Sequence, residues 1–441
     1  MTWFSRRNAA ISDQTKRSMN QLNKKGLLSL AVMIGGLAPA SVSAQAPAAF
    51  LALKGVGVGT NAGNGTDVQV DGNFAYRTWS NPRDTNHPGG FEIFSVTNPS
   101  APAWVGNYES RGSANAVRVV NGYAYLAEGI RRNGTNDTGV FEIIDVSQPA
   151  NLIRVGAIDT VGWANAVSVD GHYAYVAEST RWTGSNLVGA LEIFDVSMPT
   201  NPVRVAIHDT GGSATSVDAS GGYAFLADGV TDLEVLDVSN PASPSRAGGY
   251  DIDERNLGAE FAAPATYIQR TGNRVYSSGE NGFHILDVSN PTNPRRLGGD
   301  NDLPVYAFHE ANNYVHAAYY SSFHNTFLLS VIDVSDPTNL TWIASSAIPV
   351  WPGSLHAVGS NVYLATNELL LYELRPPPVI RSFSRSNGTL VLTWDDAPGF
   401  NLQRTASLDD PDWSDVPGST NARSLSLPLT GGSGYFRLAR P

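Results

Sequence analysis

Two histidines and a tyrosine in the second half of the chain are of the types that transfer protons. His309 and His356 occupy equivalent positions in two neighbouring repeat units, and Tyr319 follows His309 in the same unit. Histidine and tyrosine, with a nearby arginine, can abstract the proton α to a carboxylate, and histidines can also bind zinc. The spacing matches no recognised catalytic or metal signature. A purely structural role for both histidines is therefore the stronger alternative.

Three carboxylates, those of Glu128, Glu178 and Asp228, share an equivalent position at the ends of expected strands in neighbouring units. Ca²⁺ is a hard cation that takes several oxygen ligands, so these residues are the candidate metal site. The alternative is that each carboxylate accepts hydrogen bonds from a turn within its own unit. No dense Asp-x-Asp-x-Asp loop accompanies them, which favours this alternative. Beyond Ca²⁺ the sequence indicates no cofactor.

Tryptophan and arginine gather in the segments between expected strands. Aromatic faces stack on the C–H surfaces of sugars while polar groups take the hydroxyls, so this mixture suits a carbohydrate ligand. The alternative for each tryptophan is packing between repeat units. The candidate ligand-binding residues are Trp79, Arg83, His87, Arg131, Arg132, Trp163, Arg181, Trp182 and Trp351.

A nine-residue sequence motif recurs along the chain, and the repeat units that it marks must position all of these side chains. Its third copy reads Leu191-Glu-Ile-Phe-Asp-Val-Ser-Met-Pro199. The aspartate can accept a hydrogen bond from a backbone N–H just beyond it, and the proline removes a ladder donor, so the phrase ends a strand. Good copies span 91–99, 141–149, 191–199, 233–241, 283–291 and 329–337, and a degenerate copy spans 369–376.

Each repeat carries four strand signals, bounded by Asp-Gly, Gly-Gly or Asn-Pro breaks. Four strands repeated at steps of 40 to 50 residues are typical of a β-propeller, here with seven blades. The seventh unit supplies three strands, and a lone strand at Phe50–Val58 precedes the first unit. We therefore expect the N-terminal strand to complete the last blade and cover its open edge.

The phrase resembles the LVIVD repeat family over roughly residues 50–375. The first unit departs from it with Ser95 in place of aspartate, and the seventh departs almost throughout. The resemblance implies an exported or surface-associated bacterial propeller and brings no catalytic motif to carry over. By fold analogy alone, polysaccharide lyases on propellers use His, Tyr and Arg, which makes His309, Tyr319 and His356 the candidate catalytic residues.

Three connections between second and third strands are long, and they lie in adjacent blades. We call Trp79–Gly90, Glu128–Gly139 and Glu178–Gly189 the loop wall. The same connections in the fourth and fifth units have only a few residues. Unequal loops on one face predict a binding surface there, and drift under weak constraint is the alternative.

The N-terminal residues 1–44 read as a secretory signal. Lys24 and Lys25 precede an apolar run at 26–38, and a small-residue cleavage site ends at Ala44, while Met19 is an alternative start. The run is too short to span a bilayer. Cleavage removes six of the 29 basic and one of the 40 acidic residues, which leaves a net charge of −16. Such an acidic protein disfavours nucleic-acid binding, and the absence of cysteine excludes disulfides and thiolate sites.

A second, smaller domain is expected after the propeller, which we assign to residues 45–375. A proline linker at 376–378 precedes strand signals at 389–394, 400–405, 424–429 and 435–438. They predict a β-sandwich over residues 379–441 that resembles the fibronectin-III-like modules of exported bacterial proteins. We expect Trp394 and Trp413 to lie in its core.

The leading functional hypothesis is a monomeric, non-catalytic binding module for a glycan or a surface protein, either secreted, periplasmic or on the cell surface. A polysaccharide-active lyase is the alternative hypothesis. A purely architectural envelope protein is the third. The mature chain carries no segment apolar enough to cross a membrane.

Overall fold

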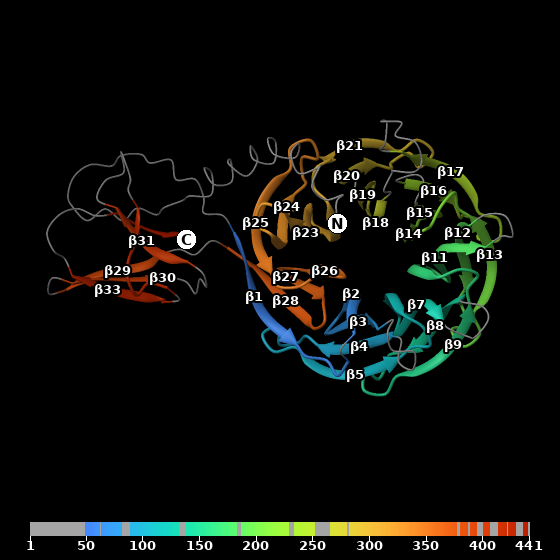
Figure 1. Ribbon diagram of the computed structural model, residues 1–441, viewed down its shortest axis with the longest axis horizontal. Coiled ribbons are helices and arrows are strands. Elements are labelled where there is room, and N and C mark those ends of the chain that lie inside the picture. The colour runs from blue at the N-terminus through green and yellow to red at the C-terminus, as the bar shows by residue number, and fades with distance from the viewer. Residues whose placement is uncertain are drawn as a thin grey trace, which may run out of the picture. The chain divides into compact units, whose positions relative to one another are not determined.

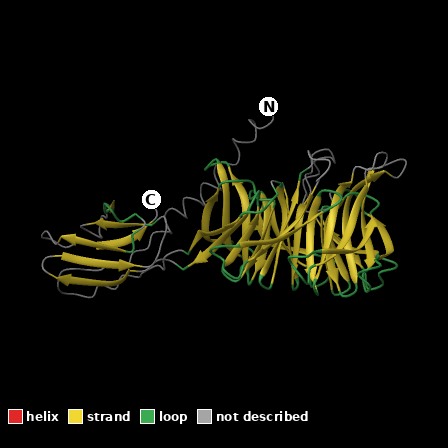
Figure 2. Cartoon of the chain, turned by 90° about the horizontal axis from the view of Figure 1, so that it is seen from below, coloured by secondary structure: helices red, strands yellow, loops and turns green. Residues whose placement is uncertain are grey.

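The computed structural model is all-β. It describes residues 49–61, 63–81, 89–131, 138–182, 187–228, 233–251, 265–279, 282–376, 380–386, 389–394, 400–405, 413–420, 422–428 and 435–439. The signal sequence predicted at residues 1–44 lies outside the described residues. Within these ranges no helix has the length and hydropathy to cross a membrane, and Figure 2 shows only strands and loops.

The third repeat shows how sequence becomes a blade. It forms β10 (Ala164–Asp170), β11 (Tyr173–Trp182), β12 (Leu187–Asp195) and β13 (Val203–Asp209), each antiparallel to the next. Residues Gly171 and His172 make the first turn, and Gly171 has a φ of 60°, a conformation that glycine adopts without strain. Apolar side chains on both faces of the strands are buried because blades pack on either side.

Six blades consist of consecutive strands, numbered here in chain order. Blade 3 is β10–β13. Blade 1 is β2 (Asn64–Asp71), β3 (Phe74–Ser80), β4 (Gly89–Ser95) and β5 (Ala103–Glu109); blade 2 is β6 (Ala114–Val120), β7 (Tyr123–Arg131), β8 (Thr138–Asp145) and β9 (Ile153–Asp159). Blade 4 is β14 (Ser216–Ser220), β15 (Tyr223–Ala227), β16 (Leu233–Asp237) and β17 (Ser245–Tyr250). Blade 5 is β18 (Ala265–Thr271), β19 (Arg274–Gly279), β20 (Gly282–Asp287) and β21 (Arg295–Asp300); blade 6 is β22 (Val305–Ala311), β23 (Tyr314–Ser321), β24 (Thr326–Asp333) and β25 (Thr341–Ile348).

The seventh blade joins the two ends of the propeller. It orders β1 (Phe50–Gly57), β28 (Leu369–Arg375), β27 (Asn361–Ala365) and β26 (Ser354–Val358), so the N-terminal strand is its outer strand. Figure 1 shows the resulting ring, with the blue β1 beside the orange β28. The predicted seven-bladed propeller and its closure by the N-terminal strand are therefore confirmed.

The repeated Asp-Val-Ser phrase acts as the expected strand terminator. In blade 3 the Oδ1 atom of Asp195 accepts a hydrogen bond from the backbone N–H of Ser197 at 2.8 Å, and hydrogen bonds from the side chain and the backbone of Ser197 lower the pKa of the aspartate. Asp145, Asp237, Asp287 and Asp333 make the same bond to the serine two residues later. These half-buried aspartates hold turns.

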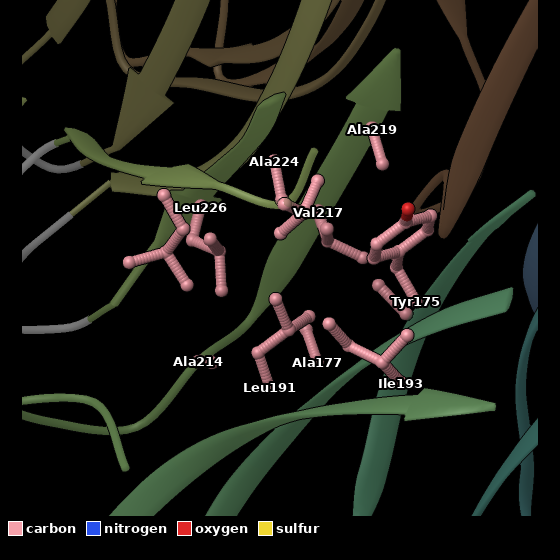
Figure 3. Packing of buried hydrophobic residues seen from close by; sticks show 12 residues of the cluster. Tyr175, Ala177, Leu191, Ile193, Ala214, Val217, Ala219, Ala224 and Leu226 are labelled. Carbon is pink, nitrogen blue, oxygen red and sulfur yellow. The ribbon is translucent and has the colours of Figure 1, made fainter. Parts of the chain in front are cut away.

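The core lies between blades. Tyr175, Leu191 and Ile193 of blade 3 pack against Val217 and Leu226 of blade 4, as Figure 3 shows. Burying several such side chains at every interface supplies the dominant stabilising term, at about 1.5–3 kcal/mol per large side chain.

The chain beyond the propeller forms two three-stranded sheets, as a small sandwich requires. One orders β29 (Ile380–Ser386), β30 (Thr389–Trp394) and β33 (Ser424–Pro428), and the other orders β32 (Ser414–Asp415), β31 (Asn401–Thr405) and β34 (Tyr435–Ala439). The sequence predicted β30, β31, β33 and β34 and missed β29 and β32. Trp394 is buried with Leu392 and Phe436, as expected, and Trp413 lies under the guanidinium of Arg437.

Candidate functional site

The inner strands of the seven blades surround the axis of the ring (Figure 1), and one equivalent position on each carries a polar residue. Strand register aligns Gln69, Arg118, Ser168, Asp218, Gln269, His309 and His356. We call these residues the axial ring.

Five members of the axial ring accept a hydrogen bond from the inner strand of the next blade. The bonded backbone N–H belongs to the residue that follows the next ring member. The pairs are Gln69 with Val119, Ser168 with Ala219, Asp218 with Arg270, Gln269 with Glu310, and His356 with Val70, at 2.7 to 3.2 Å. The two glutamines also donate to the backbone carbonyl of the same partner. The ring therefore joins blade to blade at the axis.

His309 and His356 are brought together in this ring, with their ring centroids 4.2 Å apart. His356 accepts the Val70 N–H through Nδ1, so it must be neutral. Burial lowers the pKa of His356 to about 4, and burial together with His356 lowers the pKa of His309 to about 2. Both are neutral imidazoles and poor bases at neutral pH.

Tyr319, the third candidate for proton transfer, is not part of this arrangement. Its side chain is only 5% exposed in the core of blade 6, and its hydroxyl lies 3.1 Å from Ser330 Oγ. Burial raises its pKa. The proposed set of His309, Tyr319 and His356 is therefore corrected, because a buried tyrosine cannot reach a substrate.

Asp67 and Arg118 form an axial ion pair that the sequence analysis missed. The Oδ2 atom of Asp67 lies 2.9 Å from Nη1 of Arg118 and also accepts the N–H of Val117. Although burial alone would lower the pKa of Arg118, the Asp67 carboxylate raises it. The available sequence signal was the charged residue Asp67 inside a predicted strand.

The carboxylates considered as calcium ligands are buried and hold loops. Glu128 Oε2 accepts the backbone N–H of Gly112 at 2.8 Å, and Glu178 Oε2 accepts that of Gly162 at 2.6 Å. Asp228 is also buried, with 3% exposure. The described residues contain no group of three or more His, Asp or Glu side chains that could hold a metal ion. Glu128 and Glu178 therefore each hold the loop that enters their blade from the preceding one, rather than a turn inside the blade.

The loop wall is described only in part. Arg83, His87 and Arg132 lie outside the described residues. Arg131 is the last residue of β7, and Arg181 and Trp182 are the last two of β11. At these residues β7 pairs only with β8, and β11 only with β12, as two-stranded hairpins.

Trp79 was expected on the exposed wall, and this expectation is wrong. It is 2% exposed, and its indole lies against Gly63. A buried indole cannot stack on a ligand. Trp163, between β9 and β10, is 36% exposed, and Trp351, between β25 and β26, is 55% exposed.

Trp351 belongs to a cluster of aromatic side chains that reach the surface, which we call the aromatic platform. Its members are Tyr306, Tyr320, Phe327 and Trp351. The centroid of the Trp351 ring lies 4.6 Å from Tyr306 and 5.2 Å from Phe327, and Tyr320 lies 5.3 Å from Phe327. Tyr306 is 39% and Tyr320 36% exposed. Of these four residues, only Trp351 was predicted from the sequence.

The comparison with protein families decides the classification. The LVIVD repeat model matches residues 62–110, 111–160, 161–210, 211–252, 266–298 and 323–346, which together are more than half of the chain. The protein belongs to the LVIVD repeat family. Each of the first four LVIVD matches spans one blade.

One solved structure supports the propeller fold. The WD40 β-propeller domain of Doa1 is similar over 74% of this chain and 97% of that chain, with a TM-score of 0.51 and 10% sequence identity. The computationally designed Ika8 protein is similar over 73% of this chain and 100% of that chain, with a TM-score of 0.47 and 8% identity. No curated protein matches the chain.

The aromatic platform lies where the LVIVD repeat is least regular. The match in blade 6 is confined to residues 323–346, and blade 7 has none. Tyr306, Tyr320 and Trp351 therefore fall outside the matched segments. These three aromatic residues thus coincide with departures from the repeat, whereas Phe327 lies inside the match.

Proposed function

We propose that this LVIVD propeller is an exported binding module that holds a glycan on its aromatic platform. The repeat architecture and the propeller fold are those of a repeat-based interaction module. The exposed face of Trp351, flanked by Tyr306, is the single observation that carries the choice of ligand.

The platform has the chemistry that sugar rings need. An exposed indole offers a flat apolar face to the C–H groups of a pyranose, and a neighbouring phenol hydroxyl can bond its hydroxyls. Tyr320 donates a hydrogen bond to Asn325 Oδ1 at 2.6 Å, so a polar group lies beside the aromatic faces. A purely apolar protein interface would not require it.

The arginines and Trp182 of the loop wall, on blades 2 and 3, form a second contact region in this proposal. Export rests on the signal sequence predicted at residues 1–44. The C-terminal sandwich is proposed as a fibronectin-III-like accessory module, and a surface protein is the alternative partner. The lowered pKa values of His309 and His356 make both of them weak bases, so neither is given a part in turnover.

Affinity electrophoresis tests the proposal. Protein lacking residues 1–44 is run in native gels that contain neutral or acidic polysaccharides, and the gels are then stained for depolymerised zones. We expect retardation with intact polymer, lost in Trp351→Ala and retained in Trp104→Ala. Trp104 on β5 is the matched control because its indole is 41% exposed on the outer strand of blade 1. A cleared zone would instead make the protein an enzyme, and no retardation would favour a protein partner.

A further inference from the structure

Blades 2 and 3 each bury two carboxyl groups in contact with each other. Glu128 on β7 and Glu142 on β8 are diagonal neighbours on one face of the sheet, as are Glu178 on β11 and Glu192 on β12, and within each pair the carboxyl groups interact. All four side chains have 0% exposure. We call these two pairs the acid pairs.

Within the first acid pair, Glu142 has the partners of an ionised carboxylate. Its Oε2 accepts the hydroxyl of Tyr108 at 2.6 Å, and its Oε1 accepts Nη1 of Arg154 at 2.9 Å. The Nε atom of Arg111 lies 3.3 Å from the same Oε1. Two cations and a hydroxyl therefore stabilise a negative charge on Glu142.

Glu128 has no such partners. Its Oε2 accepts the Gly112 N–H, whereas its Oε1 is buried and accepts no hydrogen bond from any described group. Two ionised carboxylates in contact would repel strongly at this burial. A proton on Oε1 removes the repulsion and gives the orphaned oxygen a partner in Glu142. Burial first, and then the Glu142 charge, raise the pKa of Glu128 well above its ordinary value.

The second acid pair repeats this arrangement. Glu192 accepts Nε of Arg204 at 2.7 Å and the N–H of Val161 at 2.6 Å. Glu178 accepts the Gly162 N–H, and its Oε1 is again buried without a donor among the described groups. Burial and the Glu192 charge raise its pKa in the same way.

Blade 1 lacks the second acid and has a buried cation beside the first. Glu92 occupies the position of Glu142, but Trp79 stands in place of Glu128. The guanidinium of the fully buried Arg77 lies 3.2 Å from Glu92. A single carboxylate with its own cation needs no proton. Blade 1 therefore differs from blades 2 and 3, where two carboxyl groups are in contact.

We propose that Glu128 and Glu178 each keep a proton at neutral pH, shared with Glu142 and Glu192, and that losing these protons loosens the inter-blade loops at Gly112 and Gly162. The second loop also holds the wall, because Gly162 accepts the backbone N–H of Gly139 at the start of β8. Alkaline pH would therefore act on the loop wall of the proposed binding face, although the acid pairs do not depend on any ligand.

The sign of the pH effect follows from proton linkage. In the native state Glu128 and Glu178 hold protons. In the unfolded state the same two carboxyl groups release these protons above their ordinary pKa, near 4.5. Stability therefore falls as pH rises above that value, until the folded pKa is passed. Each acid pair changes the unfolding constant by about tenfold per pH unit in this window, and both together by about a hundredfold.

A double variant, Glu128→Gln/Glu178→Gln in the full chain, tests the proposal. Each amide donates permanently to the neighbouring carboxylate and still accepts the glycine N–H. In a scan from pH 5 to pH 9, we expect similar unfolding midpoints for variant and wild type at pH 5, and a wild-type midpoint that falls below that of the variant as the pH is raised. Parallel curves over this range would overturn the proposal.

The matched control is Glu142→Gln/Glu192→Gln, which removes the ionised partner of Arg154 and Arg204. We expect it to lower the midpoint at every pH. Infrared spectroscopy of the wild-type protein detects protonated carboxyl groups directly and needs no variant. A protonated-carboxyl band that persists at neutral pH and shifts in D₂O supports the acid pairs, and its absence would refute them even if the variants failed to fold.

Discussion

Ser354 of blade 7 donates its hydroxyl hydrogen bond to Asp67 of blade 1, with 2.9 Å between Oγ and Oδ1. The same carboxylate accepts the N–H of Val117 and the guanidinium of Arg118 from blade 2. Three blades therefore meet on one buried side chain. The propeller is closed at its axis by this carboxylate as well as by β1 in the seventh blade.

Asp67→Asn should open that closure. The amide nitrogen cannot accept the Val117 N–H or pair with Arg118, which leaves buried donors without a partner. We expect a loss of about 2–4 kcal/mol in the free energy of unfolding. Thermal denaturation measures it against Asp71→Asn, which changes an exposed aspartate on the same strand. Equal midpoints for both variants would show that Asp67 does not close the ring.

Trp79→Ala should destabilise the fold rather than weaken ligand binding. Removing a buried indole typically costs about 3–5 kcal/mol because a cavity remains. Trp79→Phe keeps most of the volume and removes an indole N–H that has no acceptor among the described groups, so we expect it to cost less than about 1.5 kcal/mol. Trp104→Ala is the exposed control. Urea unfolding ranks the three, and an Ala variant as stable as the control would contradict the burial of Trp79.

His309→Gln should stabilise the protein. Gln69 and Gln269, at equivalent ring positions, each bond both the N–H and the C=O of the next blade, whereas His309 Nδ1 is buried and makes no hydrogen bond with any described group. Two new bonds at about 1 kcal/mol each predict a rise of several degrees in the unfolding midpoint.

The gain from His309→Gln should grow in acid. The lowered pKa of His309 means that the native state stays neutral while the unfolded state takes up a proton below about pH 6.5. Stability is thus complete above that pH and is lost as pH falls, by about tenfold in the unfolding constant per pH unit. A midpoint difference that is constant from pH 7 to pH 5 would contradict this assignment.

The fold was predictable because its signals are local and repeated. Each copy of the strand-ending phrase marks a blade, and a single copy such as Leu191–Pro199 already contains the strand, the turn aspartate and the proline. β29 and β32, which were not predicted, belong to the sandwich. Its sequence is not repeated, so a strand with an irregular pattern cannot be recognised by comparison with other copies.

The candidate site was predicted only in part because exposure and long-range pairing are not local properties. Trp79 and Trp351 look alike in sequence, yet packing against Gly63 buries the first and leaves the second exposed. Asp67 reaches partners 50 and 287 residues away along the chain. Equivalent positions were the useful signal, since they correctly placed His309 beside His356.

Graded substitution of Trp351 tests the aromatic platform by affinity. Trp351→Phe retains a flat ring, whereas Trp351→Ala removes the face altogether. If stacking carries the interaction, its contribution of about 1–1.5 kcal/mol predicts roughly tenfold weaker binding for Ala and a smaller loss for Phe. Binding of the polysaccharide that retards the wild type is measured by fluorescence or calorimetric titration, with Trp104→Ala as the control. Because Trp351 is more than half exposed, its loss should leave the unfolding midpoint nearly unchanged. Unaltered affinity in a folded Trp351→Ala variant would move the ligand from the platform to another part of the surface.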